Sequence, residues 1–437
     1  MTEQTGRVVV PDDADYDVFR GSFNGMIDRR PARIAVCATV GDVRRALVAA
    51  REEGLPVAIR GGGHSIAGHS VCDGGVVIDL RAMKEVIVDP VARTASAGGG
   101  VTWEEFDPVC LAHGLATTGG TFGDTGIAGL TLGGGIGHLQ GRFGLTCDNL
   151  IGAQVVTAAG EVIDAGADTN HELFWALRGG GGNFGVVTRF DYRLHPIGAL
   201  LGGALAYEGT FARDVLHAFR DALHEAPEEL TIQTVVRRAG NLAVFPCWNG
   251  PIEDGEQYLA PLRAIPTMAD TVAPIRYDQM QKVFPNLPFG MRHYWKGHFV
   301  RELSDQLIDA LVEVCMEGVA DSLSSVLIEG FSGAPRRVPI DSMAFNHRDA
   351  AANVSALAMW VDPERDGDEV AWSRSTASRI EPYSASGGGY VNYMQQDEPL
   401  DRVRRAYGDE KFARLQRVKK TFDPDNVFSF NQNIPPA

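Results

Sequence analysis

One histidine of the chain directly follows three consecutive glycines, in the segment Arg60-Gly61-Gly62-Gly63-His64-Ser65. The β-branched residues before it indicate a strand that ends at the glycines. Glycine lacks a Cβ and tolerates positive φ, so such a turn lets the backbone approach a ligand closely. Its successive N–H groups suit phosphate oxygens. Taken alone, the segment is most simply a tight turn before a buried histidine. The rest of the chain favours a phosphate-binding turn with His64 at the ligand's edge.

A second glycine-rich segment covers residues 118–137. Inside a helix or strand each glycine costs roughly 0.5–1 kcal/mol relative to alanine, so a regular element would not keep so many of them. A backbone that is threaded around a large ligand explains the segment better. It therefore predicts a second wall of the same binding site.

A third segment, Gly180-Gly181-Gly182-Asn183-Phe184-Gly185, matches the dinucleotide pattern G-x-G-x-x-G. That pattern indicates a nicotinamide site only where it follows a strand and opens a helix. Here a predicted helix precedes it and a predicted strand follows it. We therefore discount a nicotinamide dehydrogenase, which would depend on this match alone.

The elements that would position these segments follow from the spacing of apolar residues. Residues 41–50 place apolar side chains at i, i+3, i+4 and i+7, which predicts a helix. Thr102-Trp103-Glu104-Glu105 is a capping box that opens another helix. Further helices are expected over residues 172–178, 213–224, 305–318, 366–380 and 411–415. Strands are expected over residues 57–60, 76–80, 85–89, 154–158, 161–164, 185–193, 325–329, 355–361 and 390–394.

Composition narrows the class of protein. The chain has 437 residues, a length that favours two domains. Of these residues 44% are hydrophobic and 22% charged, which is typical of a globular protein. Its formal net charge of −16 disfavours nucleic acid and anionic membranes as partners. The six cysteines are scattered, and no apolar run approaches the roughly 18 residues of a membrane span. We expect a soluble, cytoplasmic protein without a signal peptide and with reduced cysteines.

Histidine spacing gives no sign of a metal site. His64 and His69 lie five residues apart, and neither belongs to a metal-ligand pattern such as H-E-x-x-H. We therefore expect no metal.

Several separated segments together resemble a known family. The three glycines with His64, the segment 125–137 and the segment 144–150 resemble the FAD-linked oxidases of the vanillyl-alcohol oxidase superfamily. The segment Tyr390-Val391-Asn392-Tyr393 and the C-terminal segments 422–428 and 431–436 are similar to the berberine-bridge-enzyme-like branch. The resemblance spans residues 31–436, and no single motif carries it.

This resemblance implies an α+β fold with three parts. A PCMH-type FAD-binding domain of two subdomains would cover residues 1–196. A substrate domain, with an antiparallel sheet covered by helices, would cover residues 197–389, where glycine thins out and aromatic residues increase. A berberine-bridge-like C-terminal segment, residues 390–437, would return to the FAD domain.

The resemblance also implies covalent FAD, bonded to His64 through its 8α-methyl group. Some members add a second bond from a cysteine to the flavin C6, but that position falls at about Phe122 here, so a single bond is expected. Cys147 lies nearby in the sequence and is interpreted as a core residue. The expected cofactor contacts are Arg60, Gly61, Gly62, Gly63, Ser65, Gly68, His69, Gly119, Thr125, Gly126, Gly129, Gly133, Gly134, Gly135, Gly137, Val187 on the adenine side, Asn392, and Asn431 near the ring.

In relatives the tyrosine directly after the asparagine acts as the base, which points to Tyr393, with Tyr390 as the second candidate. A strand here would turn Tyr390 and Asn392 to one face and Tyr393 to the other. A tyrosine has a pKa near 10, so this role needs a cation or dipole that stabilises the phenolate. Lys296 and Arg348 are the candidates. The alternative is that Tyr393 is a core aromatic, as we also expect for Trp295, Trp360 and Trp248.

The expected reaction transfers a hydride from a substrate C–H bond to flavin N5, while Tyr393 takes the proton of the adjoining hydroxyl or amine. O2 would then reoxidise the flavin and give hydrogen peroxide. The alternatives are a flavin dehydrogenase that uses another acceptor and an inactive flavin-binding relative. The sequence leaves the small-molecule substrate and the oligomeric state open.

Overall fold

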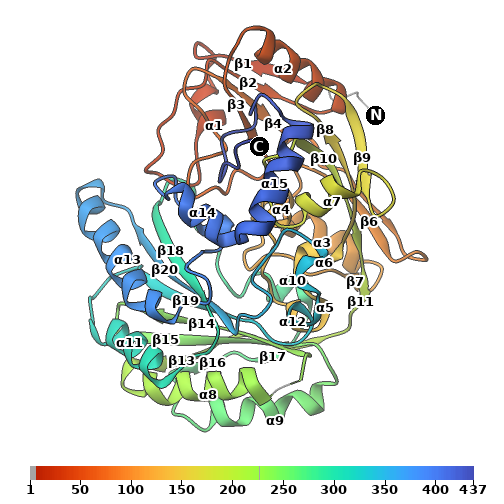
Figure 1. Ribbon diagram of the computed structural model, residues 1–437. Helices are drawn as coiled ribbons and strands as arrows, with labels where there is room; N and C mark the ends of the chain where they lie inside the picture. The colour runs from red at the N-terminus through yellow and green to blue at the C-terminus, as the bar shows by residue number, and fades with distance from the viewer. Residues whose placement is uncertain (1–5, 226) are drawn as a thin grey trace.

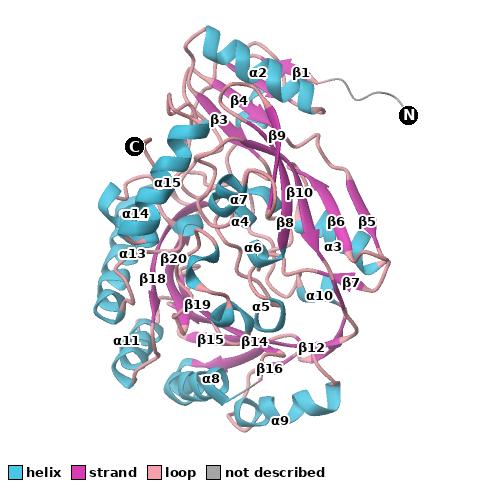
Figure 2. Cartoon of the chain, turned by 45° about the vertical axis from the view of Figure 1, so that its right-hand side comes forward, coloured by secondary structure: helices cyan, strands magenta, loops and turns pink. Residues whose placement is uncertain are grey.

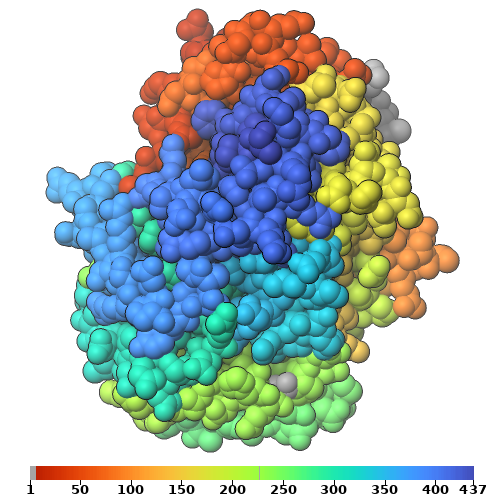
Figure 3. All heavy atoms as spheres, viewed as in Figure 1, coloured from red at the N-terminus to blue at the C-terminus, as the bar shows by residue number. Residues whose placement is uncertain are grey.

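A computed structural model describes residues 6–225 and 227–437 of the chain. It contains two smaller sheets near the N-terminus and one large sheet built from the central residues (Figure 1). The C-terminal helices lie against the N-terminal part of the chain (Figures 1 and 3). None of the described helices is long and apolar enough to cross a membrane.

The first small sheet has four strands in the order β1-β2-β4-β3, with β2 and β3 both parallel to β4. Helix α2 packs on this sheet through Val43, Leu47 and Ala50, as the apolar spacing predicts. Strand β3 ends at Arg60, so the three glycines begin where the sheet stops. The elements are β1 (Arg7–Val9), α1 (Tyr16–Arg20), β2 (Arg33–Val36), α2 (Val40–Glu52), β3 (Val57–Arg60) and β4 (Val76–Asp79).

The second small sheet has five antiparallel strands in the order β5-β6-β10-β8-β9. The capping box predicted for α3 is present, since Glu105 accepts a 2.8 Å hydrogen bond from the backbone N–H of Thr102. The elements are β5 (Val86–Asp89), β6 (Thr94–Gly98), α3 (Trp103–Leu111), α4 (Ile127–Leu132), α5 (Gln140–Phe143), α6 (Thr146–Asn149), β8 (Leu150–Val156), β9 (Val162–Gly166), α7 (His171–Leu177) and β10 (Val186–Arg193). A separate pair joins β7 (Leu115–Ala116) to β11 (His195–Pro196).

The large sheet has nine strands and is antiparallel throughout, with the main order β16-β13-β15-β14-β19-β20-β18. Four helices cover its outer face (Figure 2). The strands are β12 (Leu200–Gly202), β13 (Leu205–Glu208), β14 (Leu230–Arg237), β15 (Asn241–Trp248), β16 (Ala269–Asp270), β17 (Ala273–Ile275), β18 (Arg292–Val300), β19 (Ser325–Gly330) and β20 (Ala352–Trp360). The covering helices are α8 (Ala212–Glu225), α9 (Ile252–Arg263), α11 (Asp305–Met316) and α13 (Asp366–Ile380), and two short helices, α10 (Tyr277–Met280) and α12 (Ala334–Arg337), lie in its connections.

Successive side chains of β19 and β20 point alternately to the helix-covered face and to the inner face of the large sheet. Val326, Ile328 and Val354 belong to the core under the covering helices. Because successive strand residues point to opposite faces, Glu329 and Asn353 face the other way, toward the N-terminal part of the chain. The sheet thus presents buried polar groups on its inner face.

The C-terminal segment contains α14 (Leu400–Tyr407) and α15 (Asp409–Phe422). Its residue Phe428 joins the core of the first small sheet. Lys419 and Asp423, both fully buried, form a 2.6 Å ion pair. The Lys419 ammonium also donates to the carbonyls of Asn183 and Phe428, at 2.8 and 2.9 Å. This network ties the segment to the glycine loop that precedes β10.

The strand predicted over residues 390–394 is wrong. Residues Val391–Tyr393 form a 3-10 turn in which the backbone N–H of Tyr393 donates to the carbonyl of Tyr390 at 2.8 Å. The Tyr390 hydroxyl is held by the backbone N–H of Gly135 at 3.0 Å, which anchors the start of the turn. The helices predicted over 41–50, 213–224, 305–318 and 366–380 are confirmed within a few residues.

We expect Lys419→Met to destabilise the fold, because the variant leaves Asp423 buried without its cation. Removing one partner of a buried pair costs about 3–5 kcal/mol. The thermal unfolding midpoint should fall clearly below that of the wild type. The matched control is Lys420→Met, since Lys420 is exposed on the same helix. Equal midpoints for the two variants would contradict the anchoring role.

Candidate active site

Two glycine segments cross each other at van der Waals distance. A Cβ on Gly62 would lie 2.6 Å from the Cα and the N of Gly126, and a Cβ on Gly126 would lie 2.4 Å from the N of Gly62. No other residue type fits at either position without moving backbone. The turn after β3 and the loop before α4 are therefore fixed against each other.

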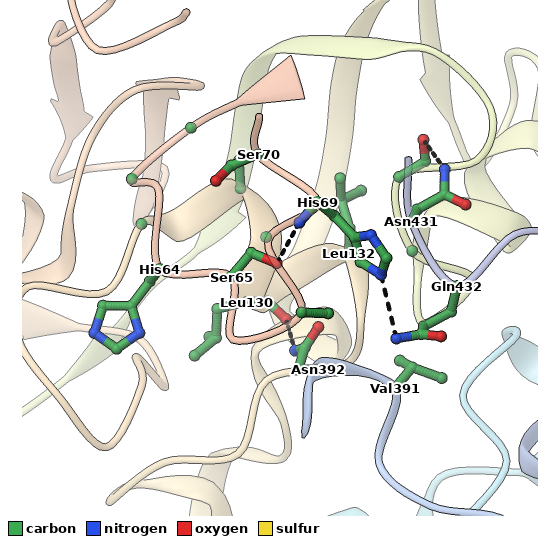
Figure 4. A pocket seen from close by; sticks show the side chains of 18 of the residues that line it. His64, Ser65, His69, Ser70, Leu130, Leu132, Val391, Asn392, Asn431 and Gln432 are labelled. Carbon is green, nitrogen blue, oxygen red and sulfur yellow. Dashed lines mark hydrogen bonds between the residues drawn. The ribbon is translucent and has the colours of Figure 1, made fainter. Parts of the chain in front are cut away.

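A large cavity opens beside this crossing, between the small sheets, the large sheet and the C-terminal segment. The cavity volume that the centres of water molecules can occupy is about 260 Å³. One water needs roughly 10–15 Å³ by the same measure, so the cavity is far larger than a water site. Its wall includes His64, Ser65, Leu130 and Asn392, with Gln432 and Asn431 farther from His64 (Figure 4). The cavity is the natural place for a large, elongated ligand.

Most of the predicted contact residues lie on this wall. Those that line the cavity are Gly61, Gly62, Gly63, His64, Ser65, His69, Thr125, Gly126, Gly129, Val187, Tyr390, Asn392, Tyr393 and Asn431. Those that lie behind the lining are Arg60, Gly68, Gly119, Gly133, Gly134, Gly135 and Gly137. Their roles as contacts remain predictions.

Packing explains the residues behind the wall. The Arg60 guanidinium donates to the carbonyls of Phe19 and Gly21, at 2.9 and 2.7 Å. A Cβ on Gly133 would lie 2.1 Å from the side chain of Asn392. A Cβ on Gly137 would lie 2.0 Å from the carbonyl oxygen of a neighbouring glycine. These residues let the wall segments pack closely.

Other lining residues were missed by the sequence reasoning. Trp295, expected in the core, is buried but lines the cavity and packs edge-on against Tyr393. Gly181 and Gly182 also line it, so the G-x-G-x-x-G segment contributes to a binding wall without opening a helix. That glycine run was the available signal. Phe430 and Gln432 complete the wall from the C-terminal segment.

The shape of the wall fits a dinucleotide. Gly129 and Gly182 line the cavity, and the position of an added Cβ at each has no protein atom within 4 Å. The free space in front of these two glycines is thus available to a ligand. None of the described lining residues is Lys, Arg, Asp or Glu. Phosphate charge would have to be met by backbone N–H groups, as glycine-rich turns do.

His64 is held in a defined orientation. Its ring stacks on Phe23 with centroids 3.8 Å apart, and Phe122 lies on the cavity wall with its ring centroid 6.4 Å away. The Nε2 atom lies 3.5 Å from Oδ1 of Asp124. Nε2 is buried beside that carboxylate and has no hydrogen-bond partner among the described residues.

His69 lies on another part of the wall. Its backbone N–H donates to Oγ of Ser65 at 3.1 Å, and the Gln432 amide donates to its Nε2 at 3.4 Å (Figure 4). Burial, with a contribution from Arg29, lowers the pKa of His69 to about 4. The ring is therefore neutral at pH 7.

A tyrosine–carboxyl pair lies at the inner face of the large sheet. The Tyr393 hydroxyl donates to Glu329 at 3.0 Å, and the Asn353 amide donates to the other oxygen of Glu329 at 2.8 Å. Glu329 is fully buried, and burial raises its pKa to about 7. Burial and the neighbouring carboxyl raise the pKa of Tyr393 well above 10. Glu329 was missed because its strand read only as a core element.

The expected cations do not stand beside this tyrosine. Lys296 donates to Glu398 at 2.7 Å, and Arg348 pairs with Asp148 at 2.9 Å. Both cations are thus paired with carboxylates of their own, and a role for either one at Tyr393 stays a prediction. The group bonded to its hydroxyl is a carboxyl.

Tyr390 and Asn392 form a second pair. The Tyr390 hydroxyl accepts hydrogen bonds from the Asn392 amide at 2.9 Å and from the backbone of Gly135 at 3.0 Å. The Asn392 amide also donates to the carbonyl of Leu130 at 3.1 Å (Figure 4). Since both side chains are used in these contacts, they position the turn that carries Tyr393.

Cys147 lies away from the cavity wall. It is buried against Met343, with the sulfur atoms 3.6 Å apart. Burial raises the pKa of its thiol, so the thiolate needed for reaction is disfavoured. His138 and Gln140 are also buried and do not line the cavity; the Gln140 amide donates to the carbonyl of Gly330 at 2.6 Å.

Comparisons with known proteins agree with this geometry. Residues 31–166 match the FAD binding domain model, and residues 389–435 match the model of berberine and berberine-like proteins. The (R)-6-hydroxynicotine oxidase of Paenarthrobacter nicotinovorans is 32% identical over 99% of this chain and 97% of its own length. An uncharacterized FAD-linked oxidoreductase of Bacillus subtilis is 30% identical over 100% of this chain and 98% of its own.

A solved structure of 6-hydroxy-D-nicotine oxidase from Arthrobacter nicotinovorans superimposes with a TM-score of 0.91 at 31% identity. It covers 99% of this chain and 98% of that one. The likeness spans the whole fold.

We expect Gly129→Val to lower the flavin content without lowering the stability of the flavin-free protein. The new side chain enters free ligand space, and such overpacking costs about 1–3 kcal/mol, which is roughly tenfold to a hundredfold in affinity. Flavin content is read from the ratio of visible to ultraviolet absorbance. The control is Gly367→Val, a helical glycine outside the cavity that also has no atom within 4 Å of an added Cβ. Equal flavin content in both variants would contradict the placement.

Proposed function

The chain belongs to the FAD-linked oxidoreductases of the berberine-bridge-enzyme-like family, and on this basis we propose that it is an oxidase with FAD bonded covalently to His64. Its substrate would be a small organic molecule with an oxidisable C–H bond next to a hydroxyl or an amine. The observation that carries the proposal is that Tyr393, whose hydroxyl donates to the buried Glu329, lines the same cavity as His64.

The residues that would hold the cofactor are those of the glycine-rich walls. Backbone N–H groups of Gly61 to Ser65 and of the loop before α4 would receive the phosphates, and Val187 would contact the adenine side. When bound, FAD supplies the acceptor for two electrons. We propose that dioxygen finally takes these electrons, so that substrate and O2 give oxidised product and H2O2.

Tyr393 and Glu329 would act together as the base. The Tyr393 oxygen accepts the proton of the substrate hydroxyl or amine while its own proton passes to Glu329 across the 3.0 Å hydrogen bond. No free phenolate has to form, so the raised pKa of Tyr393 is no obstacle. The pKa of Glu329, about 7, places the accepting group near the working pH, where general base catalysis is most effective.

The lining favours an uncharged or amine-bearing substrate over an acid. Trp295 and Phe122 form part of the wall, and the described lining has no Lys or Arg that would pair with an anion. The name of the similar (R)-6-hydroxynicotine oxidase refers to a compact aromatic amine. We propose a substrate of that size and polarity, without naming the compound.

We propose the domain bounds 1–196, 197–389 and 390–437. The first supplies the two small sheets and the second the large sheet. The third shares the core of the first, because Phe428 packs among residues of β2, β3 and β4.

We expect His64→Ala to abolish covalent attachment. After acid precipitation the wild-type pellet should be yellow, with the mass of FAD on the peptide that contains His64. The variant should release its flavin into the supernatant. A yellow variant pellet would move the attachment to another residue, and a wild-type supernatant that holds all the flavin would exclude a covalent bond.

We expect the rate of anaerobic flavin reduction by substrate to rise as the pH increases through about 7. A carboxyl with a raised pKa is protonated below that pH and accepts a proton only above it. Glu329→Gln should remove this rise, and both Glu329→Gln and Tyr393→Phe should slow reduction by roughly 10²- to 10⁴-fold. A substrate is first found by screening amines and alcohols for peroxide release.

The control is Tyr407→Phe, since Tyr407 lines the cavity but its hydroxyl has no hydrogen-bond partner among the described residues. It should keep the wild-type rate and pH profile. A Glu329→Gln variant with an unchanged profile would exclude the relay. Fast reduction with slow reoxidation by air would identify a dehydrogenase in place of an oxidase.

A further inference from the structure

Two buried polar atoms face each other beside the cavity, and each lacks a hydrogen-bond partner among the described residues. They are Nε2 of His64 and Oδ1 of Asp124, which lie 3.5 Å apart. Their side chains are only 11% and 15% exposed. An unpaired buried polar group costs about 1–3 kcal/mol. A proton on Nε2 would face the carboxylate oxygen, and a small approach of the two side chains to normal hydrogen-bond distance would satisfy both atoms at once.

The backbone crossing explains why this pair forms. His64 lies two residues after Gly62, and Asp124 lies two residues before Gly126, the glycines whose backbones touch. The stacked ring of Phe23 then fixes the plane of the imidazole. His293 stacks on the other side of Phe23. Burial lowers the pKa of His293 to about 3, so its ring is neutral and does not compete with His64 for the Asp124 carboxylate.

We propose that Asp124 controls the covalent attachment of FAD, by holding His64 in the tautomer with the proton on Nε2 and by accepting that proton during bond formation. In this tautomer Nδ1 carries the free electron pair and faces the ligand. Asp124 acts through His64 and is a positioning residue for the attachment. This proposal rests on the proposed covalent bond at His64. It adds Asp124 as the group that makes the histidine a nucleophile.

A bond forms between Nδ1 of His64 and the carbon of the flavin 8-methyl group, while one C–H bond of that methyl group and the Nε2–H bond break. The Nε2 proton passes to Asp124 and on to solvent. Two protons and two electrons are released in total, and they reduce O2, the acceptor of the proposed function, to H2O2.

Two substitutions at Asp124 separate this role from simple packing. Asparagine has nearly the same shape, but its amide can donate to Nε2 and would favour the tautomer with the proton on Nδ1, which blocks the nucleophile. Alanine leaves the tautomers free. The proposal therefore predicts slower attachment for Asp124→Asn than for Asp124→Ala. A packing role predicts the opposite order, because alanine removes more contacts.

The experiment starts from flavin-free protein, produced under riboflavin limitation and mixed with FAD in air. At intervals, acid precipitation measures covalent flavin, and gel filtration of a parallel sample measures total bound flavin. We expect Asp124→Asn to attach flavin roughly 10²-fold more slowly than the wild type, at the lower end of what positioned acid–base groups contribute. Asp124→Ala should fall between them. Total flavin binding should match the wild type in both variants.

The control is Glu104→Gln, which removes an exposed carboxylate beside the same loop, where Glu104 accepts a hydrogen bond from Asn286 at 3.3 Å. It should attach flavin at the wild-type rate. Wild-type rates in Asp124→Asn, or a slower alanine variant, would overturn the role of Asp124 and leave the bond at His64 intact. A wild-type protein that binds FAD but never retains it after acid would overturn the covalent bond, and this inference with it.

Discussion

The contact between the backbones of Gly62 and Gly126 is the constraint on which the site depends. An added Cβ would lie 2.6 Å from the opposite backbone at Gly62 and 2.4 Å at Gly126, so neither position accepts a side chain. Because the two segments cross so closely, the turn after β3 and the loop before α4 form one continuous wall. The same crossing sets His64 against Asp124. A change at either glycine would therefore disturb the cavity wall and the histidine together, even though neither glycine has a chemical function of its own.

The wall that carries Tyr393 is built from the opposite direction, by the large sheet and the C-terminal segment. Alternation along β19 turns Glu329 away from the helix-covered core. The hydrogen bonds of Tyr390 and Asn392 to Gly135 and Leu130 hold the turn from which the Tyr393 hydroxyl reaches Glu329. Burial of a carboxyl is unfavourable for its charged form, and the same burial raises its pKa into the range where it can accept a proton. Stability and proton transfer thus depend on the same environment.

Local patterns predicted what depends on neighbours in the sequence. Apolar spacing indicated α2, the capping box indicated α3, and three glycines before His64 indicated a ligand-binding turn. Long strands such as β18 were missed, because its polar residues Arg292 and Lys296 interrupt the apolar pattern that usually identifies a strand. Glu329 was missed since its partner, Tyr393, lies 64 residues away. The turn at Tyr393 read as a strand because the hydrogen bond that holds it comes from Gly135.

The distribution of charge around the cavity connects both ends of the site. The described lining has no Lys or Arg, so the phosphates of a dinucleotide would have to be neutralised by backbone N–H groups. Glycine lets those N–H groups approach a phosphate closely, because it has no Cβ. This gives a physical reason for the dense glycine segments in a chain whose net charge of −16 would otherwise disfavour an anion. The pKa of Glu329 is then governed by burial and by its hydrogen bonds to Asn353 and Tyr393. A lysine on this wall would lower that pKa and weaken the base.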